Sequence, residues 1–196
     1  NVSYFDFLMP GIVGFGVMVY SVTGMASVIA LYRQQKILKR IRATPLKVRT
    51  FFTAQVGAWL LLSLIQTGII ATAGVLIFDA NVYGNVAWIF PLVVLANLTF
   101  LNLGFIVGSY SKTVEAASGL GNAVAMPMMF LSGAFFPTDT LPAALQQLVR
   151  FLPLTPLLET LRGVMLDAEP IWAFPYEIGL LAAWVGITAV VAVRVF

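Results

Sequence analysis

The side chains that could do chemistry are concentrated in one basic segment, because seven of the eleven Lys and Arg residues lie between positions 33 and 49. No acidic residue separates them. On a helical wheel Arg33, Lys36 and Arg40 share one face, and Pro45 ends or kinks that helix. A basic amphipathic helix can lie on anionic lipid headgroups, or it can dock on a protein partner in the cytoplasm. The residues alone leave both interpretations open.

Most catalytic chemistry is excluded by the residues that the sequence lacks. It contains neither Cys nor His, which removes thiolate nucleophiles, His-based triads and the usual zinc ligand sets. It also has no P-loop motif that could hold a nucleotide phosphate. We therefore predict no catalytic, cofactor or metal site on this chain, and an intramembrane enzyme is disfavoured.

The composition defines the class of protein. Hydrophobic residues make up 60% of the 196 residues, against roughly 45–50% in a soluble domain. Charged residues make up 10%, against about 25%. The mean hydropathy is +0.96. A soluble protein, a disordered chain and a nucleic-acid binder are excluded, and the sequence predicts an all-α integral membrane protein.

Five segments have the length of about 20 apolar residues that a membrane-spanning helix needs. These predicted spans are at about 7–32, 51–78, 86–111, 116–136 and 171–196. Placing the basic segment in the cytoplasm also puts Lys112 and Arg194 there, so that the first residue lies outside and the last inside. The chain begins at Asn1 rather than Met, and we expect further sequence to precede it.

The stretch between the fourth and fifth spans, residues 138–168, contains two candidate amphipathic helices at 140–152 and 155–166. Thr155 is the expected N-cap of the second helix. We expect Leu145, Leu148 and Leu158 to face the spans, so that both helices fold back as re-entrant elements at the outer surface. An ordinary interfacial loop is the alternative.

The fourth predicted span is unusual in carrying Pro127 among several methionines. Proline interrupts the helical hydrogen bonds, and flexible Met side chains can repack around varied shapes. The residues favour core packing, with contact to a transported substrate as the alternative. In the third predicted span Gly104 and Gly108 form a Gly-x-x-x-Gly pattern, which is typical of close helix packing.

Three motifs occur in a characteristic order: KRIRATPL at 39–46, FLSGAFFP at 130–137 and PLTPLLETLRGVML at 153–166. With the surrounding spans, this order resembles the type-two ATP-binding-cassette (ABC) export permeases, the daunorubicin-exporter-like and nodulation-exporter-like group. The resemblance covers nearly the whole chain. Members of that family have six spans, and the five predicted here resemble the second to the sixth.

The resemblance implies a transmembrane subunit of an exporter in a bacterial inner membrane, with no cofactor on this chain. It implies pairing with a second permease subunit, identical or similar, and with P-loop ABC ATPase subunits that hold ATP and Mg. Residues 33–46 would be the coupling helix that rests on the ATPase, and the 138–168 stretch would cap the exit. An amphiphilic drug-like or lipid-like substrate is expected. The alternative is a channel or secondary transporter that works without an ATPase.

The expected site residues fall into three groups. Those expected at the ATPase-coupling end are Arg33, Lys36, Arg40, Thr44, Pro45 and Leu46. Those expected at an outer gate are Phe135, Phe136, Leu145, Leu148, Glu159 and Arg162. Those expected along the translocation path are Asn122, Met126, Met129 and Phe130. No acidic or basic residue lies deep in a predicted span, which disfavours an ion-coupled secondary transporter.

Overall fold

A computed structural model describes residues 4–37, 48–78, 83–135 and 142–195, and every regular element in these ranges is helical. The long helices are α1 (Tyr4–Gln34), α3 (Val48–Phe78), α4 (Ile89–Tyr110), α5 (Val114–Leu131) and α8 (Pro175–Val195). Two shorter helices are α6 (Ala143–Val149) and α7 (Leu154–Met165). Single 3-10 turns, η1 (Val86–Trp88) and η3 (Ile171–Ala173), precede α4 and α8.

Four of the described helices, α1, α3, α4 and α8, are long and apolar enough to cross a membrane. They correspond to the first, second, third and fifth predicted spans, and the start of the third near Val86 is confirmed. The fourth predicted span, 116–136, corresponds to α5, which has 18 residues and is not among the four. At 1.5 Å per residue α5 is about 27 Å long. The count of five spans therefore stays a prediction.

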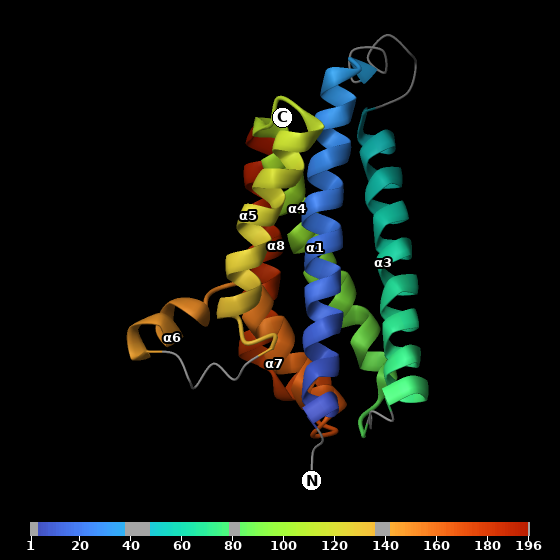
Figure 1. The fold of residues 1–196 in the computed structure, drawn as a ribbon, viewed down its shortest axis with the longest axis vertical. Coiled ribbons are helices and arrows are strands. Elements are labelled where there is room, and N and C mark those ends of the chain that lie inside the picture. Colours follow the sequence, from blue (N-terminus) through green and yellow to red (C-terminus); the bar gives the residue numbers. More distant parts are fainter. Residues whose placement is uncertain (1–3, 38–47, 79–82, 136–141, 196) are drawn as a thin grey trace.

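Helix α1 stands at the centre of the bundle, with α4, α5 and α8 on one side and α3 on the other (Figure 1). Gly104 and Gly108 let α4 approach α1 closely, because an added Cβ would lie 2.6 Å from the carbonyl oxygens of Val22 and Ala26 respectively. The Gly-x-x-x-Gly pattern thus mediates packing within the chain, as the sequence indicated. Helix α3 packs less closely against the bundle: 11% of the residues in its most apolar 18-residue segment are buried, against 50% in α1 and in α4.

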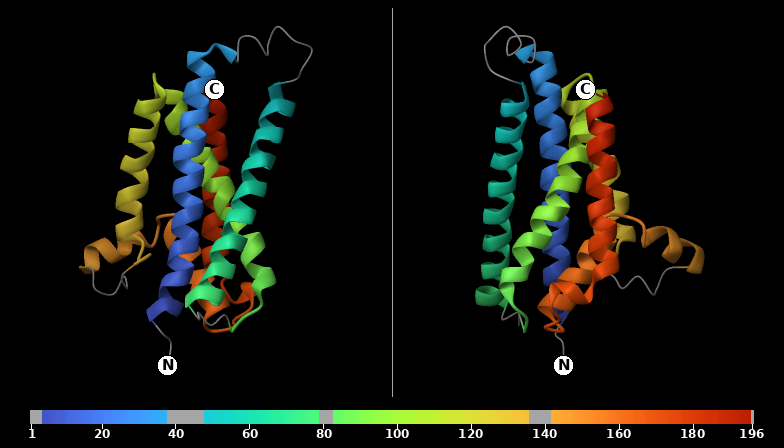
Figure 2. Two further views of the ribbon diagram at one scale, coloured as in Figure 1. Left: turned by 45° about the vertical axis from the view of Figure 1, so that its right-hand side comes forward. Right: turned by 180° about the vertical axis from the view of Figure 1, so that it is seen from behind.

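The bundle has two ends, which bring different segments of the chain together (Figure 2). At one end lie the last turn of α1 with Arg33, the turn between α4 and α5, and the C-terminal end of α8 with Arg194. At the other end lie the start of α1, helix α7 and the turn before α8. The described bases that were assigned to the cytoplasm therefore share one end of the bundle, and the side of the membrane that this end faces stays a prediction.

Candidate translocation path and its two ends

The basic end differs from the single continuous helix predicted over residues 33–46. Helix α1 ends at Gln34, and Lys36 has a backbone φ of 55°, in the left-handed region that ends helices. Its N–H still donates to the carbonyl of Arg33 (3.1 Å). Arg33 and Lys36 are both exposed, but the break between them removes the shared helical face that the sequence predicted. Four further coupling residues lie outside the described ranges: Arg40, Thr44, Pro45 and Leu46.

The opposite end is closed by α7, which is amphipathic and almost entirely buried along its apolar face. Leu154, Leu157, Leu158 and Leu161 are each 0% exposed and belong to the main hydrophobic core. The predicted inward orientation of Leu158 is confirmed. Burial of four leucines in a helix of twelve residues makes α7 part of the bundle rather than a loop on its surface.

The start of α7 differs from the prediction. The helix begins at Leu154 with Pro153 at the N-cap, so Thr155 is inside the first turn rather than capping it. The hydroxyl of Thr155 donates instead to the carbonyl of Val149 (2.7 Å), which ties the end of α6 to the start of α7. The expectation of a Thr155 N-cap was wrong because this tertiary hydrogen bond takes the side chain away from the helix terminus.

Arg162 joins three elements at this end. Its guanidinium donates to the carbonyl of Gly133, just beyond α5 (2.5 Å), and lies over the ring of Phe7 in α1, 4.0 Å from the ring centroid. Gly133 has a φ of 78°, a conformation that a residue with a side chain rarely adopts. The cation therefore links α7 to the ends of α1 and α5, where cation–π contact with a partly desolvated Arg is favourable.

The electrostatics of α7 follow from this partial burial. Burial lowers the pKa of Arg162 to about 10, opposed by the nearby Glu159 carboxylate, so Arg162 keeps its charge at neutral pH. Burial raises the pKa of Glu159, and so does the carboxylate of Glu177, while Arg150 and Arg162 act in the opposite direction. Glu159 and Arg162 thus each favour the charged form of the other, although the guanidinium of Arg162 donates its hydrogen bond to Gly133.

Helix α6 does not follow the prediction for the outer gate. It projects sideways from the bundle beside the C-terminal end of α5 (Figures 1 and 2). Leu145 is 38% exposed and Leu148 is 60% exposed, so the expectation that they face the spans was wrong for the single chain. The physical reason is that α7 already fills this end of the bundle.

Of the two phenylalanines expected at the outer gate, Phe135 packs edge-on against Phe15 with ring centroids 6.0 Å apart. Phe136 lies outside the described residues.

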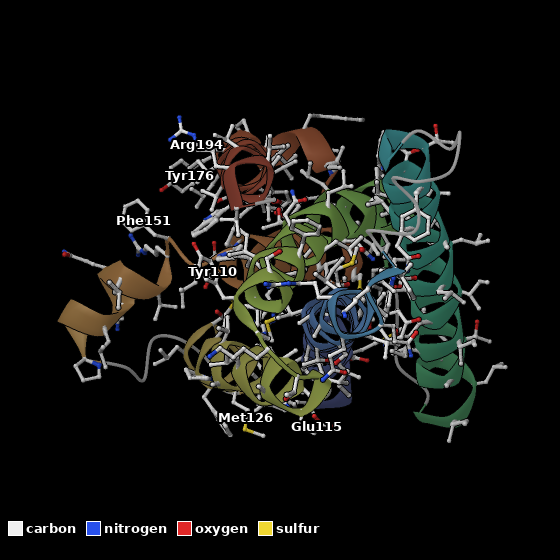
Figure 3. All side chains as sticks on the ribbon, turned by 90° about the horizontal axis from the view of Figure 1, so that it is seen from above. Tyr110, Glu115, Met126, Phe151, Tyr176 and Arg194 are labelled. Atoms are coloured by element: carbon white, nitrogen blue, oxygen red, sulfur yellow. The ribbon has the colours of Figure 1, made fainter. Side chains whose placement is uncertain are left out.

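Helix α5 has one face toward the bundle and one away from it. Small residues face inward, among them Ala117, Gly121 and Ala125, and Gly121 would contact Thr23 of α1 if it carried a Cβ. The outward face carries Asn122, Met126 and Phe130, with Met126 and Phe130 each 59% exposed. Seen from above, Met126 and Glu115 both point away from the other helices (Figure 3).

Three of the four predicted path residues therefore share a face of α5. Asn122, Met126 and Phe130 are spaced by four residues and stand one above another along the helix. Met129 is on a different side and packs partly buried against the main core. Their spacing in the sequence is enough to indicate that these three residues share one face of a helix. Met129 instead supports the alternative that the methionines of this helix pack in the core.

The residues that contact Arg162 and Phe151 at the α7 end of the bundle were not predicted. Phe7 and Gly133 contact Arg162 from positions far away in the sequence, and Trp184 of α8 donates from Nε1 to the carbonyl of Phe151 (2.8 Å). Only Gly133 had a signal, because a glycine after a long apolar run is typical of a helix end. The other two contacts join segments whose neighbourhood no local pattern indicates.

An apolar groove of about 470 Å³ lies on α3, lined by Ile65, Gly68, Ile69, Thr72, Ala73, Leu76 and Ile77. All of these residues belong to one helix, so the groove is wide open and has no second wall within the described chain. It is remote from the outward face of α5, and we do not assign it to the path.

The helical bundle, with several apolar helices and bases gathered at one end, defines a multi-pass membrane protein. Residues 2–166 match the family described as ABC-2 type transporter. The match covers most of the chain, which therefore belongs to the ABC-2 type transporter family.

Similar proteins include permeases and nodulation proteins. The chain is 31% identical over 187 residues to Nodulation protein J of Rhizobium meliloti, covering 94% of this chain and 70% of that protein. It is 36% identical over 95 residues to Nodulation protein J of Rhizobium leguminosarum bv. viciae, covering 48% of this chain and 36% of that protein. It is 24% identical over 177 residues to the linearmycin resistance permease protein LnrN of Bacillus subtilis, covering 89% and 46%.

Proposed function

We propose that the chain is the transmembrane subunit of an ATP-driven exporter in a bacterial inner membrane. A second permease subunit completes the path for an amphiphilic drug-like or lipid-like substrate. Separate P-loop ATPase subunits bind ATP together with Mg and hydrolyse the ATP. The observation that carries the proposal is the outward face of α5. On it one amide and two large apolar side chains, Asn122, Met126 and Phe130, are left exposed by the residues that the structure describes.

That combination suits an amphiphile. The exposed side chains of Met126 and Phe130 offer apolar and aromatic contact, and Met adapts to varied shapes. Asn122 adds a hydrogen-bonding group on the same face without bringing a charge into the bilayer. Facing a second permease subunit, this strip would become one wall of a shared path.

Helix α1 connects the proposed path to the proposed coupling end. It runs from Phe7, which contacts Arg162 at the outer end, to Arg33 at the basic end. It packs closely against α5 and the residues that follow it: Thr23 lies beside Gly121, and a Cβ added to Gly11 would meet the backbone of Ala134, just beyond α5. A displacement of the basic end by an ATPase would therefore reach both the face of α5 and the outer end through one rigid helix.

The decisive experiment is ATP-dependent transport by purified complexes reconstituted in liposomes. The probes are a fluorescent anthracycline and a phospholipid labelled with a fluorescent headgroup. Phe130→Ala should lower transport of the accepted probe about tenfold, the equivalent of about 1.4 kcal/mol of lost binding. Val193→Ala is the matched control, because Val193 is 78% exposed on α8, away from the proposed path.

Two outcomes would contradict the proposal. Transport that continues unchanged without any ATPase would favour the channel or secondary transporter. Equal losses of transport in Phe130→Ala and Val193→Ala would show that α5 does not line the path.

The coupling end has its own test: charge reversal at Arg33, Lys36 and Arg40 should abolish ATPase association while membrane insertion stays normal. If insertion fails and association persists, the basic segment is a lipid anchor.

The orientation can be tested by single cysteines, because the chain has none of its own. Lys36→Cys should react with an impermeant maleimide only from the cytoplasmic side, and Asp167→Cys only from outside. Labelling of both positions from the same side would overturn the proposed topology.

A further inference from the structure

Three buried polar side chains lie in the middle of the bundle without the partners that buried polar groups require. The hydroxyls of Ser63 and Thr67 in α3 and the Nδ2 of Asn97 in α4 have no hydrogen-bonding partner among the described residues. These residues are 0%, 2% and 0% exposed respectively. They account for three of the five such side-chain atoms in the described chain.

The two hydroxyls of α3 are unusual within this molecule. Several other helical Ser and Thr residues donate to the carbonyl four residues earlier: Ser21 to Val17 (2.6 Å), Thr160 to Pro156 (2.8 Å) and Thr188 to Trp184 (2.6 Å), for example. That local hydrogen bond is the usual solution for a hydroxyl in an apolar helix. Ser63 and Thr67 do not use it, so their hydroxyls can both donate and accept.

The packing brings these groups to one level of the bundle. Val56 and Trp59 of α3 pack against the small cluster that contains Met25 of α1 and Leu101 of α4. Four residues from Met25, Trp59 and Leu101, in each case toward the outer end, stand Ser21, Ser63 and Asn97. Each step is one helical turn in the same direction, because α3 runs opposite to α1 and α4.

A direct contact supports this shared level. The hydroxyl of Ser21 lies 3.4 Å from Oδ1 of Asn97, joining α1 to α4. Thr67 follows one turn further along α3, beside Gln66, whose Nε2 would lie 2.9 Å from a Cβ on Gly16 of α1. The inward stripe of α3 is therefore polar where it crosses the α1–α4 seam and apolar on either side.

We propose that Ser21, Ser63, Thr67 and Asn97 form a site for ordered water between α1, α3 and α4. Water fits because it donates and accepts at once, and a buried water usually has two to four polar partners. Ser63 and Thr67 are four residues apart, about 6 Å along the helix axis, which a water with two hydrogen bonds of about 3 Å can bridge. A metal cation fits poorly, since Nδ2 of Asn97 presents a hydrogen rather than a lone pair.

The site would explain how α3 is held in place. Helix α3 is the least buried of the four long apolar helices, and this polar level lies in the middle of its only inward stripe. A water shared by three helices would stabilise that contact while allowing its hydrogen bonds to be exchanged as the helices shift. The proposal does not depend on the substrate or on an ATPase.

The test is the thermal unfolding of the full chain in lipid nanodiscs. A site that binds water and a site without water predict different changes in Tm when a hydroxyl is removed. If water is bound, Thr67→Val and Ser63→Ala should each lower Tm by about 2–4 °C. The double variant should lose less than the sum, since both changes remove the same water. Thr99→Val is the matched control: Thr99 is equally buried in α4, but its hydroxyl is directed at the carbonyl of Leu95 (3.4 Å).

If the site is dry, Thr67→Val removes an unpaired buried hydroxyl, and Tm should rise or stay unchanged, which would overturn the proposal. Strictly additive losses would also overturn it. Should a variant fail to fold, radiolytic hydroxyl labelling of the unmodified protein decides instead. Bound water should cause oxidation of the buried Met25 beside the site, and equal protection of Met25 and the distant buried Met165 would contradict it.

Discussion

Helices α6 and α7 come from the same proline-punctuated stretch and have the same amphipathic character, yet they end in opposite environments. In α7 the apolar face is buried in the bundle, with Leu158 and Leu161 both 0% exposed. In α6 the leucines at 145 and 148 are exposed and the helix projects from the bundle. An amphipathic pattern thus indicates which face is apolar, but it does not indicate what that face packs against.

The difference lies in tertiary anchors rather than in hydrophobicity. Helix α7 is held by Arg162 to α1 and to the end of α5, and the carbonyl of Met165 accepts a hydrogen bond from the N–H of Tyr83 (2.9 Å). The anchors around α6 are at its end, where the Phe151 carbonyl accepts from Trp184. Helix α7 therefore belongs to the structural frame, whereas the free face of α6 is available to a second subunit or to lipid.

The largest effect should come from introducing a carboxylate into the two helices. Leu161→Asp buries an unpaired charge and loses a fully packed side chain, which should cost more than about 4 kcal/mol and prevent stable folding. Leu148→Asp places the same carboxylate at a 60% exposed position and should leave folding intact. Size-exclusion profiles of fluorescently tagged protein in mild detergent measure both. If both variants lost their monodisperse peak to the same extent, α6 and α7 would be equally important for folding, which would contradict the distinction drawn between them.

Removal of the Arg162 anchor should have the next largest effect. Arg162→Ala loses a charged hydrogen bond to Gly133 and the contact with Phe7, which together should lower stability by about 1.5–3 kcal/mol. Thermal unfolding in nanodiscs should show this as a Tm lower by several degrees. Arg162→Lys should recover only part of it, because the ammonium group cannot reproduce the planar fork. Arg150→Ala, at an exposed position, is the control and should be neutral.

The third effect concerns transport rather than stability. Leu145→Asp with Leu148→Asp should leave Tm within about 1 °C of the unmodified protein, because neither side chain packs in the bundle. If the apolar face of α6 meets a second subunit near the exit, the same variant should change export or basal leak severalfold while ATPase association stays normal. Normal transport by a stable double variant would assign that face to lipid alone.

The long elements could be predicted from the sequence because bilayer thickness sets their length. The start of α4 near Val86 and the packing role of Gly104 and Gly108 followed from hydropathy and from residue size, two properties that need no knowledge of neighbours. The inward position of Leu158 in α7 followed from helical spacing in the same way.

The disagreements depend on features that lie outside the pattern of any single helix. Thr155 was expected to cap α7, but its hydroxyl donates to Val149. Lys36 adopts a left-handed backbone that its residue type does not favour, which breaks the predicted basic helix. The position of Leu148 depends on where α7 packs. Arg162 in α7 contacts Phe7 in α1, which is far away in the sequence. Local patterns cannot specify such arrangements, because they are decided by competition for space in the assembled bundle.

The smallest effect should appear in the pH dependence of α7. Burial and the nearby Glu177 raise the pKa of Glu159 above its ordinary 4.5, so the folded state disfavours the ionised form. The contribution of Glu159 to stability should therefore be fully present below about pH 4.5 and should be lost as the pH rises through the raised folded value. Glu159→Gln should remove this dependence and raise Tm slightly at pH 7, with no gain at pH 4. The gain should be small, because Glu159 is only partly buried and solvent screens its charge. Glu115→Gln, exposed at the other end, should leave the profile unchanged, and a Tm that rises with pH across this window would reverse the assigned sign.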